Sequence, residues 1–131
     1  MSDFIPPTGP EGEMPLVAIV EDDREQVALL RRYFAGHGVP VAFVAYDGRE
    51  AVDRFREAEV KPRVIIMDYS MPGANGIDVT RQILAISPDV RVIFLSGKRL
   101  DEREALESGA IAVLRKPASL HTIVDAIRAA A

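Results

Sequence analysis

The sequence predicts an α/β fold, a doubly wound sandwich in which helices cover both faces of a five-stranded parallel sheet. Five short apolar runs alternate with segments whose apolar residues have helical spacing. Several of the runs are apolar at every position, which is typical of strands buried on both faces. Strands that alternate with helices form parallel sheets, because each helix carries the chain back to the edge where the next strand begins.

The five predicted strands are rich in β-branched residues, and each is short enough to cross a sheet once. They are LVAIV, VAFVA, VIIM, VRVIFL and IAVL, at residues 16–20, 41–45, 64–67, 90–95 and 111–114.

Five helices are predicted between and after these strands. They lie over about residues 24–35, after Asp47-Gly48, from after Asn75-Gly76 to just before Pro88, near residues 101–108, and from Ser119 onward. The first helix carries an apolar stripe that we expect to face the core, made of Leu29, Leu30, Tyr33 and Phe34.

Length and composition favour one domain in the cytoplasm. A chain of 131 residues is long enough for one domain. The absence of cysteine excludes disulfides and thiolate metal sites, and the net charge of -4 argues against binding to nucleic acid. It contains no apolar stretch of membrane-spanning length and no signal-peptide pattern at its start. Residues 1–14 are rich in proline and glycine and are predicted to be a flexible tail, with a docking role as the alternative, so the folded domain covers 15–131.

Polar side chains stand at the ends of four predicted strands. Glu21, Asp22 and Asp23 follow the first strand, Asp68 the third, Ser96 the fourth and Lys116 the fifth. In a doubly wound fold the carboxyl ends of the strands share one edge, where ligands bind. The sequence therefore predicts that three of these acids, Glu21, Asp22 and Asp68, line one crevice together with a hydroxyl and an amine.

This set of residues suits phosphoryl chemistry. Clustered carboxylates need a counter-charge, and hard oxygen ligands favour Mg²⁺, held here by Glu21 and Asp22 with an oxygen from Asp68. Asp68 is also placed to attack phosphorus as a carboxylate nucleophile. Mg²⁺ and Lys116 would neutralise charge on the phosphoryl group, and Ser96 would donate a hydrogen bond to it.

Four stretches in this order resemble the receiver domain of two-component response regulators, members of the CheY-like superfamily. They are VAIVEDD, VIIMDYSMPGANG, VIFLSG and LRKPAS, and the resemblance extends over about residues 16–130. It implies a flavodoxin-like fold with strand order 2-1-3-4-5.

The resemblance also implies a function. Asp68 would accept a phosphoryl group from a histidine kinase or a histidine phosphotransfer protein, and the backbone carbonyl of Ser70 would join the Mg²⁺ ligands. Ser96 would be the switch hydroxyl, and a cis peptide would join Lys116 to Pro117. Such a protein is a signalling switch that catalyses only its own phosphorylation and dephosphorylation. Its downstream partner would be a protein target or an output domain, and homodimer formation is a further option.

Two features depart from the family pattern. Val113 stands three residues before Lys116, where the family usually has an aromatic residue, and the segment from Ser96 to Gly109 is slightly short. Both put the usual transmission of the signal in doubt and leave the phosphorylation site intact.

Other interpretations remain open. A phosphatase with an aspartate nucleophile usually has a second acid where this chain has Ser70, and a degenerate receiver that only binds partners would lack one of the site residues. Asp23 is expected to cap the first helix, Glu25 and Gln26 are candidates for kinase contact, and Ser70 and Lys98 for control of phosphoryl lifetime. His37 is expected on a surface loop and His121 without an acidic partner.

Overall fold

The computed structural model describes residues 14–71, 74–97 and 102–131. The predicted tail lies outside the described residues except for Met14, and Lys98 also lies outside them.

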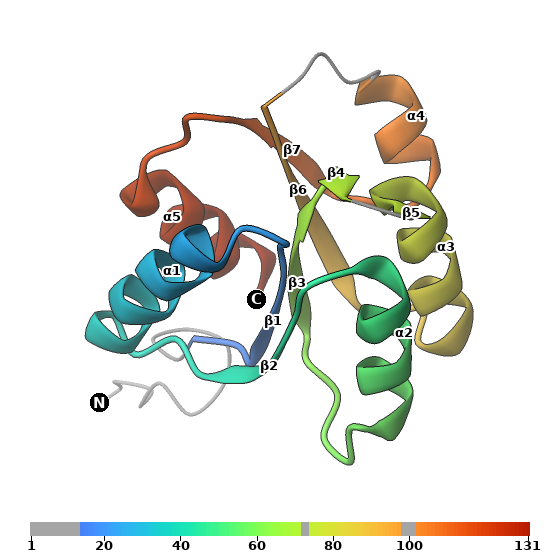
Figure 1. Ribbon diagram of the computed structural model, residues 1–131, viewed down its shortest axis with the longest axis horizontal. Helices are drawn as coiled ribbons and strands as arrows, with labels where there is room; N and C mark the ends of the chain where they lie inside the picture. The colour runs from blue at the N-terminus through green and yellow to red at the C-terminus, as the bar shows by residue number, and fades with distance from the viewer. Residues whose placement is uncertain (1–13, 72–73, 98–101) are drawn as a thin grey trace, which may run out of the picture.

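A five-stranded parallel sheet forms the centre of the molecule, with helices on both faces (Figure 1). Its order is β2-β1-β3-β6-β7, which confirms the predicted order 2-1-3-4-5 for the five long strands. These strands are β1 (Val17–Val20), β2 (Val41–Ala45), β3 (Val64–Asp68), β6 (Arg91–Ser96) and β7 (Ala112–Arg115).

The strand order reverses at β1, because β1 pairs with β2 on one side and with β3 on the other. The chain that leaves β1 turns towards β2, whereas the chain that leaves β3 continues towards β6. The connections that leave their carboxyl ends therefore run in opposite directions, and doubly wound folds bind ligands at such a point.

Two short strands after β3 were not predicted. The sequence indicated only a turn over MPGANG, but Ser70–Met71 (β4) pairs antiparallel with Ala74–Asn75 (β5). Two residues on either side of a tight turn are enough to pair backbone groups, and so short a pairing leaves no periodic pattern in the sequence.

The five helices confirm the predicted alternation with the strands. They are α1 (Arg24–Gly36), α2 (Gly48–Glu57), α3 (Gly76–Ile86), α4 (Glu102–Glu107) and α5 (Leu120–Ala130). Four of them begin after a side chain that accepts a backbone N–H bond from the first turn, as helix N-termini require. These capping residues are Asp23, Asp47, Asn75 and Ser119.

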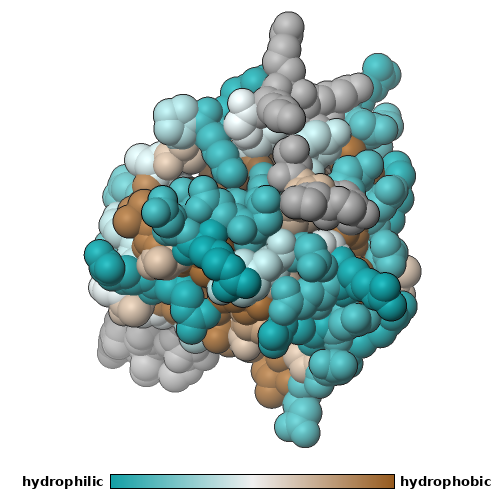
Figure 2. All heavy atoms as spheres, viewed as in Figure 1, coloured by the Kyte–Doolittle hydropathy of each residue, from teal (hydrophilic) through white to brown (hydrophobic). Residues whose placement is uncertain are grey.

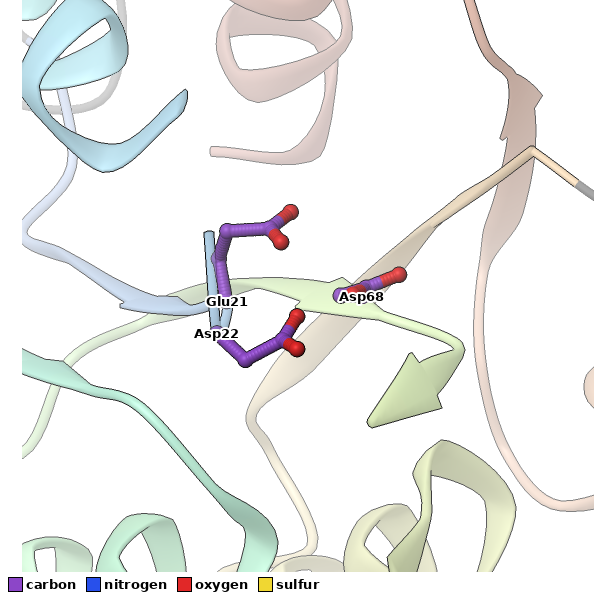
Figure 3. A group of neighbouring side chains, drawn as sticks. All are labelled: Glu21, Asp22 and Asp68. Atoms are coloured by element: carbon purple, nitrogen blue, oxygen red, sulfur yellow. The ribbon is translucent and has the colours of Figure 1, made fainter. Parts of the chain in front are cut away.

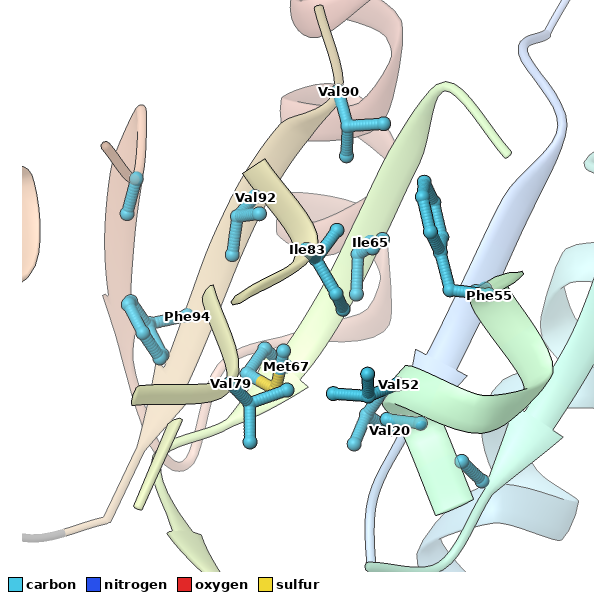
Figure 4. Close-up of a cluster of buried hydrophobic side chains, with 14 of the residues drawn as sticks. Val20, Val52, Phe55, Ile65, Met67, Val79, Ile83, Val90, Val92 and Phe94 are labelled. Carbon is cyan, nitrogen blue, oxygen red and sulfur yellow. The ribbon is translucent and has the colours of Figure 1, made fainter. Parts of the chain in front are cut away.

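Alternate side chains of the sheet pack into two separate clusters. One cluster packs against α1 and α5 and includes Ile19, Ile66 and Leu95. The other packs against α2, α3 and α4 and includes Met67 and Phe94 (Figure 4). Strand β3 is buried at all of its positions, which explains why its sequence is apolar without alternation.

The prediction that Leu29 lies in the core is wrong, because its exposed fraction is 47%. The buried positions of α1 are Val27, Leu30 and Phe34. These residues recur every three or four positions, and a helix turns about 100° per residue, so Leu29 lies outside the buried face.

Hydrophilic side chains cover most of the face shown in Figure 2, with apolar side chains visible between them. None of the described helices is both long enough and apolar enough to cross a membrane.

Candidate functional site

The carboxyl edge of the sheet gathers the predicted residues from four strands. Glu21 and Asp22 directly follow β1, and Asp68 is the last residue of β3. Ser96 is the last residue of β6, and Lys116 directly follows β7. Parallel strands end at the same edge, so residues far apart in the sequence meet there.

Lys116 is the cation at the centre of the site. Its Nζ lies 3.2 Å from Oε1 of Glu21, to which it donates a hydrogen bond, and 3.5 Å from Oδ1 of Asp68. Both carboxylates are buried, whereas the Lys116 side chain is 30% exposed. The predicted cis peptide between Lys116 and Pro117 is present.

Three carboxylates form the acidic part of the site. One oxygen from each of Glu21, Asp22 and Asp68 lies within 4.8 Å of the other two. Figure 3 shows Glu21 and Asp22 on one segment with Asp68 on the neighbouring strand, and their carboxylates close together. Asp22 is exposed, so the group opens to solvent on its side.

The arrangement shifts two pKa values in the metal-free protein. Burial, reinforced by repulsion from Asp68, raises the pKa of Glu21 to about 7. The backbone N–H of Asp23 and the ammonium of Lys116 act in the opposite direction but do not offset this increase. Burial acts to lower the pKa of Lys116, but attraction to Asp68 and Glu21 outweighs burial and raises it. Burial therefore favours the neutral form of Glu21 more than the backbone N–H of Asp23 and the ammonium of Lys116 together favour its ionised form.

A divalent cation fits this group on grounds of charge and donor type. When ionised, the three carboxylates and one ammonium leave an excess of two negative charges. Carboxylate oxygens are hard ligands, and the exposed position of Asp22 leaves room for water, which Mg²⁺ retains in protein sites. Glu21, Asp22 and Asp68 could therefore hold Mg²⁺.

The two serines of the predicted site come from different strands. Ser96 is buried and ends the strand next to β3, and its carbonyl accepts a hydrogen bond of 2.8 Å from the backbone N–H of Lys116. This bond ties the end of β6 to the residue that supplies the ammonium. Ser70 lies in β4, two residues after Asp68.

Residues outside the acidic group have other contacts. Asp23 caps α1, as predicted, by accepting N–H bonds from Glu25 and Gln26 at 2.9 and 3.2 Å. His37 is exposed at the end of α1 and stacks on Tyr33, which confirms a surface position. The expectation that His121 lacks an acidic partner is wrong, because its Nε2 lies 3.2 Å from Asp125, one helical turn away.

Sequence reasoning missed the close packing of Gly76 beneath the site. A Cβ on Gly76 would lie 2.5 Å from the Phe94 ring and 3.2 Å from the carbonyl oxygen of Asp68. Gly76 is the first residue of α3, and only a residue without a side chain lets that helix approach β3 so closely. The sequence signal that could have indicated this close packing was a glycine at the first position of a helix, directly after the capping residue Asn75.

Comparison with known proteins gives one family. A sequence model described as "Response regulator receiver domain" matches residues 17–128. The chemotaxis protein CheY of Thermotoga maritima is 34% identical over 113 residues, covering 85% of this chain and 92% of that protein. The response regulator GacA of Pseudomonas protegens is 34% identical over 115 residues, covering 86% of this chain but 53% of GacA. This chain thus spans about half the length of GacA.

Solved structures share the fold. A chain in the CheX-CheY-BeF3-Mg+2 complex from Borrelia burgdorferi has a TM-score of 0.82 at 25% identity, over 91% of this chain and 90% of that one. A receiver domain protein from Clostridium thermocellum has a TM-score of 0.82 at 29% identity, over 88% and 92%.

Proposed function

Since this chain belongs to the response regulator receiver domain family, we propose that it is a phosphorylation switch in which Asp68 accepts a phosphoryl group from a phosphohistidine. The donor is a histidine kinase or a histidine phosphotransfer protein, and the phosphorylated state regulates a protein partner. The receiver domain is assigned to residues 15–131, after a tail of residues 1–14.

The chemical step is an in-line displacement at phosphorus. A carboxylate oxygen of Asp68 forms a bond to phosphorus while the bond between phosphorus and the histidine nitrogen breaks, and the imidazole leaves with the electron pair. The product is an acyl phosphate on Asp68. Water later attacks the phosphorus, releases inorganic phosphate and restores the carboxylate.

The chain's own residues place and stabilise the phosphoryl group. The ammonium of Lys116, 3.5 Å from Asp68, is close enough to contact an oxygen of a group bound there. The Ser96 hydroxyl donates a hydrogen bond to another phosphoryl oxygen. Ser70 and Lys98 are the proposed controls of phosphoryl lifetime through access of water to the acyl phosphate, and Lys98 lies outside the described residues.

Mg²⁺ would be held by Glu21, Asp22, Asp68 and the backbone carbonyl of Ser70, and when bound it supplies positive charge that stabilises the transferring phosphoryl oxygens. The structural neighbour from Borrelia burgdorferi was crystallised with beryllofluoride, which imitates a phosphoryl group, and with Mg²⁺, which supports this assignment.

One observation carries the proposal: the ammonium of Lys116 and the carboxylates of Glu21 and Asp22, from two other strand ends, converge on the nucleophile Asp68. The phosphatase alternative is disfavoured because Ser70 stands where the second acid of such an enzyme is expected. A degenerate receiver is disfavoured because the acids, the hydroxyl and the lysine are all present in the chain.

The test is phosphoryl uptake from phosphoramidate, a small donor with a P–N bond, in the presence of Mg²⁺. Mass spectrometry of the intact protein should find one added phosphoryl group in the wild type and none in Asp68→Asn. Asp23→Asn is the matched control, because it changes a neighbouring acid that caps α1 outside the acidic group, and it should retain uptake. Equal labelling of Asp68→Asn would refute the assignment, and steady turnover of p-nitrophenyl phosphate would favour the phosphatase.

A further inference from the structure

A half-buried tyrosine lies beside the phosphorylation site without a role in the proposed chemistry. Tyr69 directly follows Asp68, and its backbone N–H donates a 3.1 Å hydrogen bond to the carbonyl of Leu95. Asp68 is paired with Leu95 in the register of β3 and β6. One step further along this register, Tyr69 lies level with Ser96.

Tyr69 and Ser96 are directed to the same face of the sheet. Side chains alternate along a strand, and Leu95 packs on the α1 and α5 side, whereas Phe94 packs on the α2, α3 and α4 side. Ser96 is therefore on the side of Phe94. Tyr69 packs against the same cluster, and its ring and the Phe94 ring form a T-shaped pair with a centroid distance of 6.0 Å and an interplanar angle of 74°.

The same row of residues leads to α4. Ser96 is paired with Arg115 on β7, and the guanidinium of Arg115 lies 3.9 Å from Glu102 in the first turn of α4. Val113 is two register positions lower, paired with Phe94. Its side chain is half-buried and aliphatic, so Val113 supplies no aromatic ring that could turn when Ser96 moves.

We propose that Tyr69 is the positioning residue that relays movement of Ser96 to the face around α4. When Ser96 moves towards a phosphoryl group on Asp68, it leaves space on its side of the sheet. The partly buried ring of Tyr69, which packs against Phe94, turns into that space and changes the packing beneath α4. This inference rests on the proposed phosphorylation of Asp68 and places the moving ring on β3 rather than on β7.

Beryllofluoride with Mg²⁺ provides the test, with NMR of the full chain as the measurement. The chain has three tyrosines and no tryptophan, so ring-labelled tyrosine gives three sets of signals, assigned with Tyr33→Phe and Tyr46→Phe. We expect beryllofluoride to shift the Tyr69 ring signals together with the methyl signals of Ala105 and Leu106 in α4.

The variant Tyr69→Leu should lose the shifts of Ala105 and Leu106 but keep those of Lys116, and Tyr69→Phe should retain all of them because it keeps the ring. Tyr46→Leu is the matched control: Tyr46 is also half-buried, but it follows β2, on the other side of β1. It should leave the shifts in α4 unchanged.

Two results would overturn the relay while leaving the phosphorylation site standing. One is a wild-type Tyr69 ring that is unchanged although Ser96 and Lys116 shift, a result that does not depend on any variant folding. The other is persistence of the α4 shifts in Tyr69→Leu. By contrast, a wild type whose Lys116 and Ser96 do not respond to beryllofluoride would overturn the proposed function, and the relay with it.

Discussion

The ammonium of Lys116 lies 3.2 Å from the carboxylate of Glu21, although 95 positions separate the two residues in the chain. The same ammonium lies 3.5 Å from Asp68, so it stands between the residue proposed as a metal ligand and the residue proposed as the nucleophile. Its charge offsets part of the repulsion between two buried carboxylates, which would otherwise be costly to hold together.

Replacement of this ammonium should weaken capture of a phosphoryl mimic. In Lys116→Met we expect beryllofluoride affinity to fall about tenfold or more, since a hydrogen bond to a charged group contributes roughly 1.5–3 kcal/mol. Fluorine NMR of bound beryllofluoride measures the affinity. Arg115→Met is the control, because its side chain is exposed and has no contact with Asp68 among the described interactions. Equal losses in both variants would contradict the role of Lys116.

Mg²⁺ should stabilise the folded protein, because the acidic group exists only when the strand ends are assembled. At a concentration 100 times its Kd, a ligand that binds only the folded state adds about 2.7 kcal/mol to the free energy of unfolding. We expect thermal denaturation to show this gain in the wild type and a much smaller one in Asp22→Asn. Asp23→Asn, which retains a capping side chain, should respond to Mg²⁺ as the wild type does. A similar Mg²⁺ response in Asp22→Asn would place the ion elsewhere.

The affinity for Mg²⁺ should decrease as the pH is lowered, because Glu21 becomes protonated. Its pKa is raised to about 7, so lowering the pH through 7 protonates the carboxyl, and a protonated carboxyl is a poor ligand. Calorimetric titrations should find binding about tenfold weaker one pH unit below that pKa than well above it.

The variant Glu21→Gln isolates this effect. It should bind Mg²⁺ more weakly at high pH, since a charged ligand is lost, and its affinity should change little between pH 6 and 8. An unaltered pH profile in Glu21→Gln would assign the titration to another group.

Gly76→Ala should destabilise the protein, because the added Cβ would lie 2.5 Å from Phe94 and 3.2 Å from the backbone of Asp68. Overpacking of this kind costs roughly 1–3 kcal/mol, measurable as a lower urea midpoint. Gly36→Ala is the control: Gly36 is also in a helix, and a Cβ there would meet no atom within 4 Å. That variant should be neutral or slightly stabilised, because alanine has the higher helix propensity. A stable Gly76→Ala would show that Phe94 and α3 can move apart.

Much of the fold was predictable from local patterns. The runs at residues 64–67 and 17–20 are apolar throughout because both of their faces are covered, and this pattern identified central parallel strands. Capping residues such as Asp23 and Asn75 placed the starts of helices. Leu29 was misplaced because adjacent leucines occupy different sides of a helix, and the sequence does not state which of them meets the sheet.

By itself the sequence determined which residues stand at strand ends, since a carboxylate, hydroxyl or amine that terminates an apolar run is visible in the chain. Tertiary structure alone decided their distances, the raised pKa of Glu21, the contact of Gly76 with Phe94 and the position of Tyr69 beside Ser96. These properties depend on how parallel strands are ordered and registered across the sheet. Burial and electrostatic repulsion arise from neighbours in space, which local sequence patterns do not specify.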